Sequence, residues 1–265
     1  MAARFDFAQR VGITYYLTTT NSCSSLLYMD AKTLSVAVDW LGRIDYQAAL
    51  ILQETLVQER VAAPELEDRL LLLEHPPTYT LGRGGDMRHL LLNEAQLAER
   101  QIAFYRVGRG GDITYHGPGQ LVGYPILNLK RLHSLRGLAQ PDLHAYVSDI
   151  EQVLIHTLAH FGVAGWRYEG YTGVWVDTAN GPCKIAAIGV RVSSKGISSH
   201  GFALNVATDL SYFTHIIPCG IKEHGVTSLT RMLQRPVAIA EVIAPLVEAF
   251  REVFHMEHVL ENDTI

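Results

Sequence analysis

The alternation of strand-like and helix-like hydrophobic patterns constrains the fold of this chain more than any other feature of its sequence. From Ser35 onward, short apolar runs typical of strands alternate with longer stretches in which apolar residues recur every 3.6 residues, as on one face of a helix. The clearest helical patterns cover residues 142–161 and 239–254. Because strands and helices are interspersed with no repeat and no clear linker, the pattern predicts a single α+β domain over residues 35–265.

Local signals place individual elements within this domain. Asp45 is expected to cap one helix, and Asn93 with Gln96 forms a capping-box pattern that opens a short helix ending near Arg100. The Asn180-Gly181 pair predicts a hairpin turn. Strands are expected at residues 35–41, 70–73, 78–81, 102–107, 121–129, 173–177, 184–192 and 203–206, and a further helix at 227–233. The apolar face of the helix at 142–161 is expected to consist of Leu143, Tyr146, Val147, Ile150, Leu154, Leu158 and Phe161.

The first 34 residues differ from the rest of the chain. They contain a polar, Ser/Thr-rich stretch with no sustained hydrophobic period, which predicts a poorly ordered N-terminal extension over residues 1–34. They lack the apolar core and small-residue cleavage site of a secretory signal. Three interpretations stay open: an uninformative tail, a start codon upstream of the true first residue Met29, or a weak organellar transit peptide.

Composition excludes several classes of function. The net charge of −5 and the absence of any run of Lys or Arg give no support for nucleic-acid binding. The longest uncharged apolar run, near residues 70–73, is far shorter than the roughly 20 residues of a membrane-spanning helix. The 3 cysteines show no CxxC spacing, which argues against a disulfide scaffold or a thiolate zinc site and favours a reducing compartment such as the cytoplasm.

Residues 109–120, with the sequence RGGDITYHGPGQ and called here the glycine-rich segment, contain the densest group of hydrogen-bond donors. Gly110 and Gly111 would allow backbone N–H groups to converge on one oxygen, and Tyr115 and His116 add polar side chains. This composition is typical of a loop that binds an oxyanion or a carbonyl oxygen. The glycine spacing fits neither the dinucleotide-binding pattern nor the phosphate-binding P-loop.

Cys219 is the candidate nucleophile. Its neighbours Pro218 and Gly220 fix a bend and allow close approach of a ligand, which suits an exposed thiol better than a core residue. A free thiol has a pKa of about 8.5 and is only about 3% thiolate at pH 7, so it needs a nearby cation or base.

Lys184 is the candidate for the cation or base that activates Cys219. It begins an apolar strand pattern, and its stem is expected to lie on packed surface on the same strand face as Ala186 and Ile188. Cys183 is the less favoured nucleophile because it follows a turn and points away from Lys184.

Several other polar residues are candidate neighbours of the site. His200 leads into a strand, and His75 ends a buried one, so both are possible pocket residues, as is Arg83. His156 and His160 have the four-residue spacing of metal ligands on a helix, but no third ligand is evident. We therefore expect them to lie on a solvated face, and the sequence predicts no metal site.

Five segments, taken in order, resemble the lipoyl(octanoyl) transferase family. The most specific is the glycine-rich segment, together with the Tyr124-Pro125 pair that follows it. The others are EHPPTYTLGR at residues 74–83, KIAAIG at residues 184–189, SHGFALNV at residues 199–206 and PCG at residues 218–220. The resemblance extends from about residue 38 to residue 254. It implies the mixed sheet with flanking helices of the biotin/lipoate protein ligase catalytic domain, an α+β fold.

The resemblance also implies an activity. Enzymes of this family take an octanoyl group from acyl carrier protein and pass it to a lysine of a lipoyl domain, in 2-oxoacid dehydrogenase complexes or the glycine cleavage H protein. They use no metal or nucleotide cofactor. The family's thioester-forming cysteine corresponds to Cys219 and its activating lysine to Lys184. Its substrate-binding residues correspond to Arg109, Gly110, Gly111, Asp112, Ile113, Thr114, Tyr115, His116, Ala187, Ile188, Gly189, Gly201, Phe202 and Ala203.

The expected mechanism is a two-step transfer through a Cys219 thioester, in which Lys184 assists deprotonation and backbone donors hold the oxyanion. A local basic face, with Arg83 and Arg88 as candidates, is expected to dock an acidic carrier. Two alternatives stay open. One is an ATP-dependent lipoate or biotin ligase of the same fold, and the other is a non-catalytic acyl-binding protein.

Overall fold

The computed structural model describes residues 34–135, 137, 140–217, 224–256 and 258–261. The N-terminal extension predicted for residues 1–34 therefore lies outside the described residues, apart from Leu34. The strands are β1 (Ser35–Arg43), β2 (Asp68–Glu74), β3 (Thr78–Leu81), β4 (Ala103–Arg106), β5 (Ile113–His116), β6 (Gln120–Ile126), β7 (Trp166–Tyr168), β8 (Tyr171–Thr178), β9 (Gly181–Val192), β10 (Ser198–Asn205), β11 (Gly225–Val226) and β12 (His258–Glu261). The helices are α2 (Tyr46–Ala62), α3 (Glu94–Glu99), α4 (Leu129–Leu135), α5 (Leu143–His160), α6 (Leu229–Leu233) and α7 (Ile239–Phe254), with 3-10 turns η1 (Met87–His89) and η2 (Leu210–His215).

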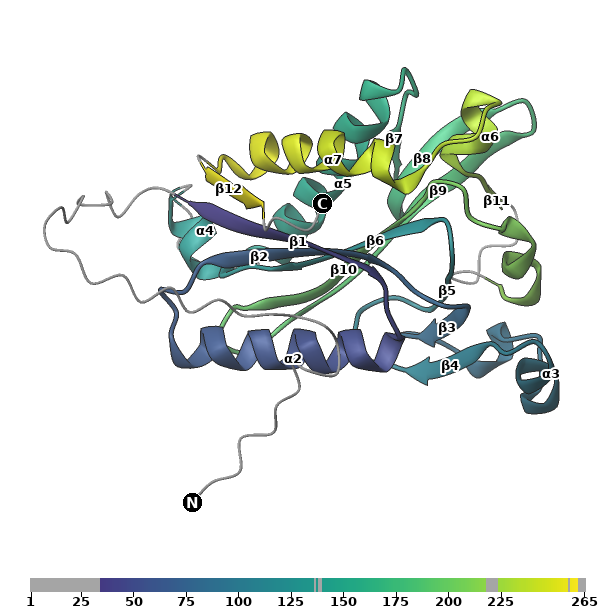
Figure 1. Ribbon diagram of the computed structural model, residues 1–265, viewed down its shortest axis with the longest axis horizontal. Coiled ribbons are helices and arrows are strands. Elements are labelled where there is room, and N and C mark those ends of the chain that lie inside the picture. The colour runs from purple at the N-terminus through teal and green to yellow at the C-terminus, as the bar shows by residue number, and fades with distance from the viewer. Residues whose placement is uncertain (1–33, 136, 138–139, 218–223, 257, 262–265) are drawn as a thin grey trace, which may run out of the picture. The chain divides into compact units, whose positions relative to one another are not determined.

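One large mixed sheet forms the centre of the fold (Figure 1). Its strands lie in the order β12-β1-β2-β6-β10-β9-β8-β7, and β11 adds to β9. The pairs β12–β1, β1–β2 and β11–β9 are parallel, whereas the other pairs are antiparallel. A smaller sheet in the order β4-β3-β5 lies beyond the end of β2.

Helices cover both faces of the large sheet, with α5 and α7 on one face and α2 on the other (Figure 1). The run Leu70–Leu71–Leu72–Leu73 of β2 shows how the sequence serves both layers. Because successive strand residues point to opposite faces, Leu70 and Leu72 pack in the core beneath α5 and α7, and Leu71 and Leu73 pack against α2. A third cluster, which includes Tyr79 and Tyr115, fills the space between the small sheet, α3 and η2.

Most of the predicted elements are confirmed, including their caps. Asp45 accepts hydrogen bonds from the N–H groups of Gln47 and Ala48 at the start of α2. Asn93 and Gln96 form the predicted reciprocal capping box at α3. The hairpin of β8 and β9 also forms where it was expected.

Three expectations about local structure were wrong. Leu143 is 49% exposed, because it lies in the first turn of α5, before that helix reaches the core at Tyr146. The strand predicted for residues 121–129 ends at Ile126, and Leu129 begins α4. The glycine-rich segment, expected to be a loop, contains a strand, β5, that pairs with β3.

None of the helices in the described part of the chain has the length and apolarity that crossing a lipid bilayer requires.

Candidate active site

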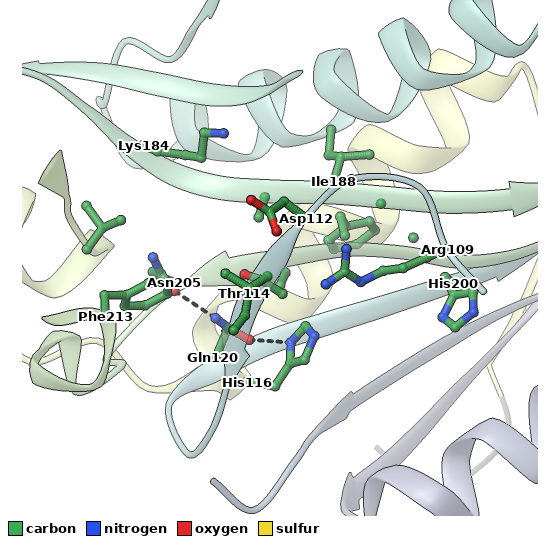
Figure 2. A pocket seen from close by; sticks show the side chains of 18 of the residues that line it. Arg109, Asp112, Thr114, His116, Gln120, Lys184, Ile188, His200, Asn205 and Phe213 are labelled. Atoms are coloured by element: carbon green, nitrogen blue, oxygen red, sulfur yellow. Dashed lines mark hydrogen bonds between the residues drawn. The ribbon is translucent and has the colours of Figure 1, made fainter. Parts of the chain in front are cut away.

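A pocket of about 890 Å³, including the part open to solvent, lies where the small sheet meets strands β9 and β10. Its walls come from the N-terminal end of α2, the glycine-rich segment, β6, β8, β9, β10, η2 and β11 (Figure 2). Its wall contains apolar side chains such as Ile188, Phe202 and Phe213, together with the polar groups of Arg109, Asp112, His116 and Lys184. An apolar pocket with a few convergent polar groups is typical of a site for a small or flexible substrate.

Glycines allow the strands that form this pocket to approach closely. A Cβ atom at Gly201 would lie 2.2 Å from the carbonyl oxygen of Gly123 on the neighbouring strand. A Cβ atom at Gly189 would lie 2.9 Å from Cδ of Arg109 and 3.1 Å from the oxygen of Gly110. The wall therefore depends on the missing side chains at these two positions.

We expect Gly201→Ala to destabilise the protein by about 3 kcal/mol, because the contact is with backbone that cannot rotate away. Gly110→Ala is the matched control, since its Cβ would lie 3.6 Å from the nearest atom, an ordinary contact, and should change the free energy of unfolding by less than about 0.5 kcal/mol. Urea denaturation of both variants measures this difference. Equal stability of the two variants would show that β10 can shift to accept the methyl group.

A series of hydrogen bonds, each donated toward the next residue, connects Thr80 with four polar side chains that line the pocket, those of Arg109, His116, Gln120 and Asn205. Arg109 donates from Nη2 to Thr80 Oγ1 at 2.8 Å, and this hydroxyl lies 3.4 Å from Nε2 of His116. Nδ1 of His116 lies 2.9 Å from Oε1 of Gln120, whose amide nitrogen donates to Asn205 Oδ1 at 2.9 Å (Figure 2). Asn205 in turn donates to the carbonyl of Thr227 at 3.1 Å.

These partners fix the tautomer of His116. Gln120 Oε1 can only accept, so Nδ1 of His116 carries the proton and Nε2 accepts from Thr80. Burial lowers the pKa of His116 well below its ordinary value of 6.5, and the neighbouring His75 and Arg109 add to this effect. His116 is therefore a neutral imidazole near pH 7.

Lys184 lines the pocket, but on a different strand face from the one predicted. A β-bulge in the β8–β9 pair sets Trp175 opposite Lys184 and Val174 opposite Ala186, so Ile185 has no partner on β8. Ile185 and Ala186 consequently both face the core, whereas Lys184 and Ala187 both face the pocket. The prediction that Lys184 shares a face with Ala186 was wrong for this reason. The lysine ammonium donates to the carbonyl oxygen of Thr172 at 2.9 Å.

Most residues predicted to bind substrate come together in the pocket wall. These are Arg109, Gly111, Asp112, Ile113, Thr114, His116, Ala187, Ile188, Gly189, Gly201, Phe202 and Ala203. Gly110 and Tyr115 do not line the pocket. The N–H of Gly110 donates to the carbonyl of Val190 at 2.9 Å, so the expectation that it helps to form an oxyanion cradle was wrong. The ring of Tyr115 is buried in the core of the small sheet.

The three possible pocket residues have three different environments. His200 lines the pocket and adopts a left-handed backbone conformation (φ 54°), which is strained for a non-glycine residue. Burial lowers the pKa of His200 to about 4. His75 lies beneath the pocket instead, between the carbonyl of Ile44 (2.9 Å) and the hydroxyl of Tyr124 (2.8 Å), and burial likewise lowers its pKa to about 4. Arg83 is exposed and does not line the pocket, so its assignment as a pocket residue was wrong.

Cys219 lies outside the described residues, but the chain on both sides of it is tied to the pocket. On the N-terminal side, the N–H of Ile217 donates to the carbonyl of His89 at 2.8 Å. The ring of His89 lies 2.5 Å from the carboxylate of the pocket residue Asp112. On the C-terminal side, His224 and β11 line the pocket, and the N–H of Thr227 donates to the carbonyl of Lys184 at 3.0 Å.

Cys183 lies outside the pocket wall. Its sulfur lies 3.7 Å from the Thr178 hydroxyl, near the hairpin turn. His156 is 43% exposed and lies 3.6 Å from a carboxylate oxygen of Glu252, as expected for a solvated face. The described residues contain no group of three or more His, Cys, Asp or Glu side chains arranged to hold a metal ion. Arg88, a candidate for carrier docking, is highly exposed but bonded to Asp86.

Sequence reasoning missed several residues of the pocket wall. Tyr46, Tyr124, Trp175, Asn205, Phe213 and His224 line it from six different elements or connections. Tyr124 and Asn205 belong to the resembling motifs, which is the only signal that could have singled them out. The other aromatic residues look like ordinary core positions in the sequence, and only the fold shows that they face a cavity.

Comparison with known proteins shows that the fold is that of the lipoate protein ligase class. The family model of the lipoyl protein ligase A/B catalytic domain matches residues 45–251. A chain in a structure of a bipartite lipoate protein ligase and its E2 lipoyl domain from Thermoplasma acidophilum superimposes with a TM-score of 0.64 at 15% identity, covering 88% of each chain. Lipoate-protein ligase A bound with ATP gives 0.63 at 15% identity, covering 88% of this chain and 90% of that one. The α+β fold is thus that of lipoate protein ligases, as predicted.

Relatives with higher sequence identity are octanoyltransferases, which narrows the class of enzyme further. An octanoyltransferase of Rubrobacter xylanophilus is 50% identical over 213 residues, covering 80% of this chain and 90% of the relative. An octanoyltransferase of Chloroflexus aurantiacus is 46% identical over 223 residues, covering 84% and 96%. The chain belongs to the lipoyl(octanoyl) transferase family, and it is an acyltransferase.

Proposed function

We propose that this enzyme takes an octanoyl group from acyl carrier protein and transfers it to a lysine of a lipoyl domain, through a thioester on Cys219. The observation that carries the proposal is the position of Lys184. It lies in the wall of a partly apolar pocket together with the glycine-rich segment, and the chain returns to this wall at His224, five residues after Cys219. The relatives named octanoyltransferase support the acyl group and the reaction.

In the first half-reaction, the proton of the Cys219 thiol passes to the amine of Lys184. The thiolate attacks the octanoyl thioester, forms a new carbon–sulfur bond and expels the thiol of the carrier, which takes its proton from the Lys184 ammonium. In the second half-reaction, the acceptor amine attacks the Cys219 thioester and gives a proton to Lys184, and the thiolate is released. Because the donor thioester is already activated, these steps consume no ATP.

Different parts of the pocket serve the two ends of the acyl group. Ile188, Phe202 and Phe213 offer apolar surface for the octanoyl chain. N–H groups near Gly111 remain candidates for holding the oxyanion, now without Gly110. The neutral imidazoles of His116 and His200 add no charge that would oppose an apolar chain.

The proposed partners are octanoyl-acyl carrier protein as donor, and lipoyl domains of 2-oxoacid dehydrogenase complexes and the glycine cleavage H protein as acceptors. The proposed location is the cytoplasm, where the 3 cysteines would stay reduced. Of the two arginines considered for carrier docking, Arg83 is exposed with no ion pair among the described residues, whereas Arg88 is paired with Asp86. We therefore retain Arg83 in this role.

Intact-protein mass spectrometry tests the proposal directly. The enzyme is mixed with octanoyl-acyl carrier protein without ATP, and we expect a mass gain of one octanoyl group that hydroxylamine removes. Cys183→Ala should still acquire the group. An adduct that forms only with free octanoate and ATP would favour the ligase mechanism instead, and binding of the carrier with no adduct under either condition would favour a non-catalytic acyl-binding protein.

A further inference from the structure

An aromatic ring holds the pocket lysine from one side. The ammonium nitrogen of Lys184 lies 4.9 Å from the centre of the Trp175 ring, directly across the β8–β9 pair. On another side it donates to the Thr172 carbonyl at 2.9 Å. Both contacts come from β8, and both exist because the bulge turns Lys184 toward the pocket.

Trp175 is itself fixed in place. Its side chain is 1% exposed, and its indole N–H donates to the carbonyl of Tyr171 at 3.1 Å. The ring of Tyr168 packs at 5.1 Å from it, and the ring of His224 packs nearly perpendicular to it at 5.3 Å. A rigid ring of this kind loses little conformational entropy when it binds a cation.

The face of an indole ring and a carbonyl oxygen both attract an ammonium ion, and neither interacts as strongly with a neutral amine. We infer that Trp175 is a positioning residue that holds Lys184 in its protonated form, so that the positive charge of the lysine favours the thiolate form of Cys219 in the proposed reaction. This inference rests on the proposed function, because it requires Cys219 and Lys184 to act together. It deepens that proposal by adding a residue that acts through Lys184.

Other titratable groups surround this site. Tyr168 ends β7, Tyr171 begins β8, and His224 precedes β11. Across the pocket lie Asp112, His116 and His200. Burial lowers the pKa of His200 to about 4 and the pKa of His116 well below its ordinary value, so neither histidine titrates with the thiol. The variants compared below all retain His224 and Asp112, so these two residues do not account for a difference between the variants.

The pH dependence of Cys219 alkylation by iodoacetamide tests the inference, with peptide mapping to separate Cys219 from Cys23 and Cys183. In Trp175→Leu, which removes the aromatic face, we expect the midpoint of alkylation to rise by about one pH unit. Trp175→Phe also loses the indole N–H but keeps an aromatic face, so its midpoint should rise by less than half as much. If Trp175→Leu does not fold, as judged by its thermal melting, Trp175→Phe against wild type still carries the test.

The Lys184→Gln variant distinguishes a failure of the proposed mechanism from a failure of the role inferred for Trp175. An unchanged midpoint in Lys184→Gln would overturn the proposed effect of Lys184 on the Cys219 thiol, and with it the proposed mechanism. A raised midpoint in Lys184→Gln together with unchanged midpoints in both Trp175 variants would overturn only the role of Trp175. Equal shifts in Trp175→Leu and Trp175→Phe would also overturn it, because the aromatic face would then be irrelevant.

Discussion

Cys219→Ala is expected to lower the rate of octanoyl transfer by roughly 10⁴-fold or more, and it should leave no octanoyl adduct on the protein. The physical reason is that the two half-reactions share one covalent intermediate. Without the thiol, the acceptor amine would have to attack the carrier thioester directly. The measurement is single-turnover transfer from octanoyl-acyl carrier protein to a lipoyl domain.

Cys183→Ala is the matched control, since it removes a thiol of the same chain without altering the pocket wall. Cys183 is half-buried and contacts Thr178 at the hairpin turn, so its loss should change the transfer rate less than about 3-fold. If Cys219→Ala retained normal turnover while Cys183→Ala lost it, the nucleophile would have been assigned to the wrong cysteine.

Lys184→Gln is expected to lower kcat/KM by roughly 10²- to 10⁴-fold, the range that a general acid–base group contributes. Glutamine is polar and only one atom shorter than lysine, but it has neither an acidic proton to give to the departing carrier thiol nor a basic site to accept one from the acceptor amine. Both half-reactions should therefore slow. Rapid-quench measurement of adduct formation and of adduct decay reports them separately.

Lys195→Gln provides the comparison for Lys184→Gln. Lys195 is exposed in the turn between β9 and β10, so its replacement removes one positive charge from the same hairpin without touching the pocket wall. Its rate should stay within about 2-fold of wild type. A similar loss in both variants would indicate a general effect of net charge on carrier binding.

The regular elements of the fold could be predicted because each has a local cause. The capping residues Asp45 and Asn93 act within a few residues of their own positions, and the leucines at 70–73 can only be buried. Identification of Lys184 as a candidate also needed only local information, because a lysine at the start of an apolar strand pattern is unusual.

The features that escaped prediction depend on pairing between distant segments. The bulge that turns Lys184 into the pocket arises from the match between β8 and β9, and no property of residues 184–189 alone shows it. The N–H of Gly110 is satisfied by Val190, 80 positions away in the sequence, which excludes it from the cradle that its glycine neighbours suggested. The role inferred for Trp175 could not be predicted either, because it depends on the same bulge, which places the Lys184 ammonium next to the Trp175 ring.

The parallel pairing of β12 with β1 has a practical consequence for anyone who engineers this protein. Residues His258–Glu261 form the edge strand of the large sheet, and this strand pairs with the backbone of Ser35–Val38. Ending an expression clone after α7 would leave that backbone as an open edge, which is a template for strand pairing between molecules and hence for aggregation. Shortened variants and tagged forms of the protein should therefore keep residues 258–261, so that this strand can still pair with β1.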